Sequence, residues 1–403
     1  MDNFDFSYKT FYLFGFGKED KVDKLLIEQN VRSVLVVCGM SHVSQSGLQD
    51  RLIQKITSHG IECTLIDKVN ASADNDLIYK GIEICRDKHV DFILAIGSGS
   101  VIDSAKAIAM GVFIEGDFFD IYFKNKANDI KKALPLGVIL TTIANGSESS
   151  YISSIQKTID TNTYKLEIAS KHLMPRFSIL NPELSFTLSP YKTACCGSTL
   201  LCKVIEQYFS NAKTNPLTDR LLESMMVSII EIMPRVLKEP YNYDLRANLM
   251  WASTIGSSNI CSKGRKGDRS VTYLCNQIRS LYAIDYGALM AIIMPSWMEF
   301  TLHHNIMRYC QFANRVFGID VDFEHKERTA RKGINALKLF FKDIGMPAYL
   351  HDLNINERSI PVFLRTLLYD KETIGNFVVL KRPDCEAIYR YSMYEKVQGA
   401  TYI

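Results

Sequence analysis

The residues best placed to do chemistry in this chain form a short Gly/Ser turn at positions 97–100. The turn follows 92–96, an apolar run short enough to be a strand buried on both faces, and precedes 101–109, where apolar residues recur at helical spacing. Backbone N–H groups in a small-residue turn at a helix N-terminus can approach an anion, and the helix dipole favours negative charge there. We therefore predict a phosphate-binding turn made of Gly97, Ser98, Gly99 and Ser100. An ordinary βα turn is the alternative, because the sequence does not match either of the common glycine-rich phosphate-binding motifs.

Four further polar residues stand where a parallel sheet would bring them to one edge. Thr141 and Thr142 end an apolar run at 137–141, and Ser147 follows in the same loop. Asp103 lies in the first turn of the helix predicted after the Gly/Ser turn. Open α/β sheets bind their ligands outside the carboxyl ends of the strands. We therefore expect these four residues to contact the same ligand as the turn.

The first part of the chain alternates strand-like and helix-like segments, which predicts a parallel sheet with helices on both faces. Strands are predicted at 33–37, 62–66, 92–96 and 137–141, and helices at 47–57 and 75–88. From about Ser189 long amphipathic stretches dominate, which predicts an all-helical second half. Because 403 residues exceed one typical core, we expect two domains, 1–187 and 188–403.

Composition and charge exclude several classes of protein. The net charge is +3, with 23% charged and 47% hydrophobic residues, so the basic bias typical of nucleic-acid binding is absent. No apolar run approaches the roughly 20 residues that span a bilayer. The first residues include acids where a signal peptide would carry positive charge. The ten cysteines include no CxxC pair, which is typical of reduced thiols. We therefore expect a cytoplasmic protein that binds neither nucleic acid nor membrane.

Several segments along the whole chain together resemble the iron-containing (group III) alcohol dehydrogenase family, in particular its butanol dehydrogenase-like branch. FILAIGSGSVIDSAKAIA resembles the family's glycine-rich cofactor motif, with Ser98 where a third Gly is usual, and LTTIANGSES resembles its second cofactor loop. The other matching segments are FYLFGFGK, FSILNPELSFTLSP, VIEQYFS, YGALMAIIMPSWMEF and, near the C-terminus, GNFVVLKRPDCEAIYR. The resemblance implies an α/β Rossmann-like domain with a parallel sheet, followed by an all-α domain, as in the dehydroquinate synthase-like fold.

The resemblance also implies a nicotinamide cofactor, a small alcohol or aldehyde as substrate, and a homodimer or larger homo-oligomer. It places Gly39 and Ser41, in the loop after the strand at 33–37, beside the cofactor. Lys165 matches a lysine that the family places near the cofactor. A solvated surface lysine is the alternative for Lys165. No Asp or Glu stands at the end of that strand to bond a ribose 2′-hydroxyl, which favours NADP over NAD.

The chain departs from the family at the metal. The family's four ligands, an Asp and three His, correspond here to Thr199, Lys203, Thr272 and Tyr286. Another His often found near the site corresponds to Asn276. A divalent ion prefers imidazole or carboxylate, and an ammonium group repels it, so we expect no metal. Cys196 and Cys275 could share the relevant helix faces, but two thiols without His or carboxylate partners make a poor alternative site.

Lys203 and Tyr286 suggest a replacement for the metal. A lysine close to a phenol favours the phenolate, which could make Tyr286 a general acid towards the substrate oxygen, while the ammonium keeps the positive charge of the lost ion. In the alternative, both side chains merely fill a cavity that has lost its metal. The leading hypothesis is thus a metal-independent NAD(P)-dependent oxidoreductase. The second hypothesis is a catalytically inactive relative that binds a nucleotide or a partner protein. The third is a lyase or synthase that uses the substrate cleft of the family.

Overall fold

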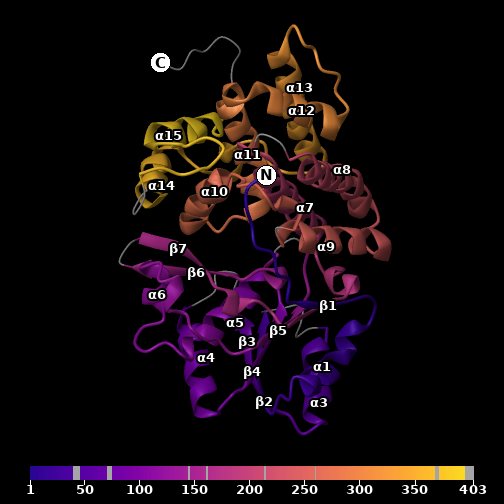
Figure 1. Ribbon diagram of the computed structural model, residues 1–403, viewed down its shortest axis with the longest axis vertical. Helices are drawn as coiled ribbons and strands as arrows, with labels where there is room; N and C mark the ends of the chain where they lie inside the picture. Colours follow the sequence, from indigo (N-terminus) through magenta and orange to yellow (C-terminus); the bar gives the residue numbers. More distant parts are fainter. Residues whose placement is uncertain are drawn as a thin grey trace. The chain divides into compact units, whose positions relative to one another are not determined.

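The computed structural model describes residues 1–39, 46–69, 75–143, 146–159, 162–212, 215–258, 260–367 and 372–394 (Figure 1). The chain divides into two compact units. The first unit comprises Phe6–Leu188 and Tyr241–Ser258. The second comprises Met1–Asp5, Ser189–Pro240 and the described residues from 260 onward.

A six-stranded parallel sheet forms the centre of the first unit, with the strand order β1-β8-β5-β4-β2-β3. Its strands are β1 (Phe11–Phe14), β2 (Ser33–Gly39), β3 (Glu62–Val69), β4 (Phe92–Gly97), β5 (Leu136–Leu140) and β8 (Phe177–Leu180). Val37 of β2 lies opposite Ala95 of β4, and Gly97 of β4 lies opposite Leu140 of β5. The three strands that precede the predicted cofactor residues therefore end at one edge of the sheet.

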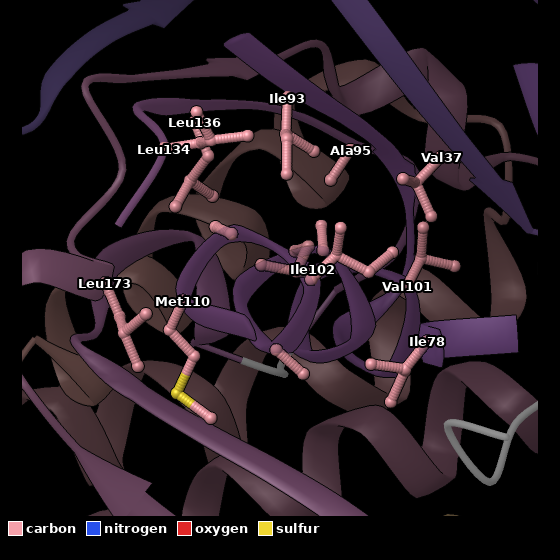
Figure 2. Close-up of a cluster of buried hydrophobic side chains, with 14 of the residues drawn as sticks. Val37, Ile78, Ile93, Ala95, Val101, Ile102, Met110, Leu134, Leu136 and Leu173 are labelled. Carbon is pink, nitrogen blue, oxygen red and sulfur yellow. The ribbon is translucent and has the colours of Figure 1, made fainter. Parts of the chain in front are cut away.

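Helices cover both faces of this sheet, which explains why its central strands are apolar throughout. The helices of the first unit are α1 (Val22–Glu28), α3 (Leu48–Thr57), α4 (Asn75–Asp87), α5 (Gly99–Gly111), α6 (Phe119–Phe123) and α9 (Tyr243–Ser257). Val37 belongs to a buried cluster with residues of α4, α5 and α6, whereas its neighbour Val36 belongs to a second cluster with residues of α1 and α3. Figure 2 shows Ile102 of α5 in the first cluster, among Ile93 and Ala95 of β4.

Two further segments complete the first unit. β6 (Ile152–Ile159) and β7 (Asn162–Ala169) form an antiparallel ribbon, and β6 contacts α5. The late helix α9 packs on β1, because the Trp251 ring meets the rings of Tyr12 and Phe14 edge-on at centroid distances of 5.9 Å. The first unit therefore includes a helix from the second half of the sequence.

The second unit is mainly helical. Its helices are α7 (Pro190–Tyr208), α8 (Pro216–Lys238), α10 (Ser270–Leu281), α11 (Tyr286–Thr301), α12 (Ile306–Phe317), α13 (Lys326–Asp343), α14 (Ile360–Leu367) and α15 (Arg382–Tyr391). α7 begins at Pro190, after the N-cap residue Ser189, whose hydroxyl accepts a hydrogen bond from the backbone N–H of Lys192 at 3.2 Å. α11 is buried along most of its length and packs on α7.

The predicted fold class is confirmed. The strands expected at 33–37, 62–66, 92–96 and 137–141 correspond to β2, β3, β4 and β5, and the second half is mainly helical. Within the described ranges, no helix combines the length and the apolar composition that crossing a membrane requires.

Candidate functional site

The Gly/Ser turn joins β4 to α5 in the first unit. Ser98 is the N-cap residue of α5 with an extended backbone, and its hydroxyl lies 3.2 Å from that of Ser100. Close packing requires a glycine at position 97, because a Cβ there would lie 2.7 Å from Cγ2 of Val101. A Cβ on Gly39, at the end of β2, would lie 3.1 Å from the same methyl group. The turn therefore leads into the N-terminus of a long helix with little side-chain bulk, an arrangement that suits a phosphate group.

The loop after β5 lies beside this turn. The backbone N–H of Thr141 donates to the carbonyl of Gly97 at 3.2 Å, and the hydroxyl of Ser147 donates to the carboxylate of Asp103 at 2.6 Å. Thr141 and Thr142 are both half-buried. The structure thus brings the predicted residues of this loop to the predicted residues of the turn and of α5.

Two lysines act on the carboxyl group of Asp103. Burial and the charge of Glu167 raise its pKa, while the charge of Lys106, the hydrogen bond from Ser147 and the charge of Lys165 lower it. Lys165 lies on β7, opposite Gln156 of β6. Lys165 therefore acts on the same acid that Ser147 contacts, whereas Ser41 lies outside the described residues.

Lys106 belongs to this group, although its type and spacing alone did not single it out. It is fully buried on α5, three residues after Asp103, and its ammonium group donates to the loop after β5. The available signal was a lysine enclosed by small and apolar residues in a predicted helix. Because lysine is almost never fully buried without partners, such a position indicates a buried polar network.

In the second unit, Thr199 and Thr272, two of the four residues predicted to replace metal ligands, have hydroxyls that donate to other protein groups. The hydroxyl of Thr199 donates to the carbonyl of Cys195 in its own helix at 2.9 Å. The hydroxyl and the backbone N–H of Thr272 donate to the two carboxylate oxygens of Glu206, at 2.6 and 2.7 Å. Burial raises the pKa of Glu206 to about 7, although the hydrogen bonds from Thr272 act to lower it. Neither threonine offers the imidazole or carboxylate donor that a divalent ion prefers.

Lys203 and Tyr286 lie on two helices that pack against each other. Lys203 is half-buried on α7, and Tyr286 is the half-buried first residue of α11. A Cβ on Gly287 would lie 1.9 Å from the carbonyl oxygen of Cys195, so α11 begins in direct contact with α7. Lys203 follows about two turns beyond this contact, roughly 12 Å along the helix axis.

Arg279 of α10 is a further cation in this region, and no sequence motif marked it. Its guanidinium carbon lies 5.4 Å from the centroid of the Tyr286 ring. Burial lowers the pKa of Arg279, while Tyr286 and Asp285 raise it. Arg279 comes seven residues after Thr272, a spacing that places both on one face of α10. That spacing was the signal that could have identified it.

The residues of this region do not fit a bound iron ion. In the part of the chain that the structure describes, no group of three or more His, Cys, Asp or Glu side chains could hold a metal. Cys275 acts electrostatically on Cys202, and burial raises the pKa of each of these two thiols well above the ordinary value. Thiols that stay protonated are poor metal ligands. The described residues of this region therefore offer cations, hydroxyls and the Glu206 carboxylate, which already accepts hydrogen bonds from Thr272, and not a set of three metal ligands.

A cavity of about 350 Å³ in the first unit lies away from the predicted cofactor residues. Its lining includes Lys9, Pro135, Lys171 and Arg176. Lys9 precedes β1, Pro135 precedes β5 and Arg176 precedes β8, so the cavity lies at the amino ends of these parallel strands. The predicted cofactor residues follow the carboxyl ends, and the cavity is therefore not part of the candidate site.

Comparison with known proteins identifies one family over both halves of the chain. Residues 9–182 match the description "Iron-containing alcohol dehydrogenase", and residues 193–393 match "Fe-containing alcohol dehydrogenase family, C-terminal". The chain is 33% identical over 395 residues to the probable NADH-dependent butanol dehydrogenase 2 of Bacillus subtilis, with 98% of this chain and 100% of that protein covered. It is 28% identical over 368 residues to the NADPH-dependent aldehyde reductase YqhD of Escherichia coli, with 91% and 93% covered.

A solved structure gives the same result for the fold. The NADH-dependent butanol dehydrogenase A of Thermotoga maritima matches with a TM-score of 0.92 and 28% sequence identity, over 98% of this chain and 99% of that one. The sequence and the fold are therefore both similar to members of this family over almost the whole length of the chain.

Proposed function

Because the chain belongs to the iron-containing alcohol dehydrogenase family, we propose that it is an NAD(P)-dependent oxidoreductase that interconverts a small alcohol and its aldehyde without a bound metal ion. One contrast carries this proposal. The candidate cofactor residues of the first unit lie together, whereas the family's metal-ligand positions hold two threonines, a lysine and a tyrosine. The relatives described above are NADH- or NADPH-dependent, which supports a nicotinamide cofactor.

The first unit supplies groups that fit a dinucleotide. Residues 97–100 would hold the diphosphate at the N-terminus of α5, where Gly97 and Gly39 let the turn pack closely against Val101. Thr141 and Thr142 would bond the cofactor from the adjacent strand end. When bound, the reduced nicotinamide supplies the hydride for the carbonyl carbon. β2 ends at Gly39 without an acidic residue to bond a ribose 2′-hydroxyl, which supports NADPH over NADH.

Lys203 and Tyr286 are the residues to which we assign the catalytic roles. Reduction of an aldehyde develops negative charge on its oxygen, and a proton must reach that oxygen. The phenol of Tyr286 donates this proton, and the ammonium group of Lys203 supplies the positive charge that stabilises the oxygen. The guanidinium group of Arg279, next to the Tyr286 ring, adds cationic character without a metal.

The proposal includes a cytoplasmic protein that forms a homodimer or larger homo-oligomer and acts on a small molecule, with no nucleic-acid or membrane partner. All ten cysteines lie in the described part of the chain, and none of them forms a disulfide. Free thiols are typical of a reducing compartment. The nearly balanced charge supports a small-molecule substrate over a nucleic acid.

A catalytically inactive relative that binds a nucleotide is the second candidate. It is favoured by the hydrogen bonds that tie the hydroxyls of Thr199 and Thr272 to Cys195 and Glu206. In this case, the cofactor residues of the first unit would act in binding alone. An activity assay with measured nucleotide binding separates the two candidates.

The test is the reduction of a panel of short aldehydes by chelator-treated protein of measured metal content, with NADPH and with NADH. We expect turnover without added metal, and a loss of at least 100-fold in both Tyr286→Phe and Lys203→Ala. Tyr282→Phe and Lys332→Ala, which alter the same residue types elsewhere in the second unit, are the matched controls and should stay within twofold.

Each other outcome contradicts a different part of the proposal. Full turnover in both Tyr286→Phe and Lys203→Ala would show that the assigned roles are wrong. Activity that depends on added iron or zinc would overturn metal independence. Nucleotide binding without turnover on any aldehyde would leave the inactive relative as the function.

A further inference from the structure

The cavity of about 350 Å³ at the amino ends of β1, β5 and β8 is lined by basic side chains. It lies within the first unit, at the opposite strand ends from the candidate cofactor residues. Its basic lining residues are Lys9, Lys171, His172 and Arg176. The other lining residues are alanine, proline and methionine, so no carboxylate of the described residues lines the cavity.

These basic side chains have no partner of opposite charge in the part of the chain that the structure describes. No ion pair or side-chain hydrogen bond joins Lys9, Lys171 or Arg176 to another described group. Exposed arginines at other places, such as Arg51 and Arg331, pair with carboxylates of the chain. The cavity therefore concentrates positive charge that the described protein groups do not neutralise.

The walls of the cavity are fixed by the sheet and by the hydrophobic core. The backbone N–H of Arg176 donates to the carbonyl of Leu136 at 2.7 Å, and the carbonyl of Arg176 accepts from the N–H of Phe11 at 3.0 Å. Leu134 and Leu173, which are sequence neighbours of lining residues, belong to the buried cluster of this unit (Figure 2). The backbone that carries the basic side chains is therefore held in place without a ligand.

A hollow lined by charges of one sign attracts counter-ions, because its low-dielectric walls focus the electric field. At neutral pH the side chains of Lys9, Lys171 and Arg176 are cations. A guanidinium group binds an oxyanion through two parallel hydrogen bonds, and ammonium groups add charge without a fixed direction. An anion with several negative charges gains more from this set than chloride does.

The size of the cavity favours a small molecule. Ligand pockets in proteins have volumes of roughly 300–1,000 Å³, and this cavity lies at the lower end of that range. Its apolar lining residues, among them Pro135 and Met174, suit a short carbon skeleton that carries the charged groups.

We propose that this cavity is a binding site for a small multivalent oxyanion, whose charge is carried by phosphate groups or by several carboxylates. Arg176 binds the oxyanion directly, and Lys9 and Lys171 neutralise its remaining charge. The inference goes beyond the proposed function and does not depend on it, because the cavity shares no residue with the candidate cofactor site.

The test is titration calorimetry of the full chain with two probes, pyrophosphate and citrate, at one ionic strength set with NaCl, since salt screens exposed charges. We expect at least one probe to bind with a dissociation constant below about 1 mM. Arg176→Gln should raise this constant at least tenfold, because it removes charge-assisted hydrogen bonds. Lys171→Gln should raise it severalfold. The probe that binds more tightly shows whether phosphate groups or carboxylates are preferred.

Arg32→Gln is the matched control for Arg176→Gln. Arg32 is an exposed arginine directly before β2, as Arg176 is directly before β8, but it does not line the cavity. Lys24→Gln, at an exposed position of α1, is the control for Lys171→Gln. Both controls should keep the dissociation constant within twofold. All four side chains are exposed, so we expect the melting temperatures of the four variants to stay close to that of the wild type.

Three results would overturn the inference. The first is that neither probe binds the wild type, and the second is that Arg176→Gln and Arg32→Gln weaken binding equally, which indicates attraction by surface charge alone. The third concerns the Gly/Ser turn, where pyrophosphate could also bind. Binding that is lost in Gly97→Ala and unchanged in Arg176→Gln would place the anion at that turn and not in the cavity.

Discussion

The carboxylate of Glu206 accepts two hydrogen bonds from Thr272, one from its backbone N–H at 2.7 Å and one from its hydroxyl at 2.6 Å. Glu206 lies on α7, and Thr272 lies in the first turn of α10. A carboxylate at this position satisfies an N–H group that the helix itself leaves unpaired, and it interacts favourably with the helix dipole. The pair therefore joins two helices of the second unit.

The buried Glu206 makes stability depend on pH. Its pKa is raised to about 7 in the folded protein, from an ordinary value of 4.5, mainly by burial. Between these two values the folded protein holds a proton that the unfolded chain has released, so the free energy of unfolding falls as the pH rises through this window. In Glu206→Gln this decrease should be smaller, by up to about 3 kcal/mol.

Urea unfolding at pH 5, 6, 7 and 8 measures this difference. Glu231→Gln, which changes an exposed carboxylate on α8 of the same unit, is the control and should follow the wild type. Parallel curves for the wild type and Glu206→Gln would show that Glu206 does not titrate in this window.

Gly287 fixes the start of α11 against α7. A Cβ at this position would lie 1.9 Å from the backbone oxygen of Cys195, which cannot move without the helix. We expect Gly287→Ala to lower the free energy of unfolding by roughly 3 kcal/mol. Gly197→Ala is the matched control on α7, because its Cβ would meet the flexible Met233 side chain, at 2.2 Å from Sδ. Urea unfolding that shows Gly287→Ala to be no less stable than Gly197→Ala would refute the close contact.

Arg279 tests the cationic character of the region around Tyr286. Its guanidinium group lies against the Tyr286 ring, so Arg279→Gln removes a positive charge next to the proposed proton donor. We expect aldehyde turnover to fall about tenfold, which is less than the roughly 100-fold or more that a general acid itself contributes, because Arg279 acts only on the charge around that acid. Arg279→Lys should restore most of the activity because it keeps the charge. Arg331→Gln, on α13, is the control for loss of an arginine. Equal turnover in Arg279→Gln and the wild type would show that this charge plays no part.

The fold could be predicted because its signals are local. β2 and β4 are short apolar runs buried on both faces, and α5 shows helical spacing directly after its turn. The position of α9 could not be predicted from local signals. Periodicity shows that a helix has an apolar face, but it does not show which of the two units that face packs on. The contact of Trp251 with Tyr12 decides it, and these residues are far apart in the sequence.

The candidate site was only partly predictable, for the same reason. The Gly/Ser turn and Asp103 are adjacent in sequence, so pattern and spacing were enough to group them. The hydrogen-bond partners of Lys106 begin 41 positions away in the sequence, at Ser147. Thr272, the partner of Glu206, is 66 positions away. A buried charge is recognised by its partners, and partners at such separations are known only once the chain is folded.

A substitution at Gly97 tests whether the Gly/Ser turn binds the cofactor, without altering the loop after β5. In Gly97→Ala the new Cβ would lie 2.7 Å from Cγ2 of Val101, so the turn and the N-terminus of α5 must separate. Because the diphosphate would bind at this helix end, we expect the dissociation constant of NADPH to rise at least tenfold in titration calorimetry. Gly81→Ala is the matched control: it also crowds α5, with its Cβ 2.4 Å from Cδ1 of Ile108, but away from the turn. It should lose stability and keep its affinity within twofold. Equal affinities in the two variants would place the diphosphate elsewhere.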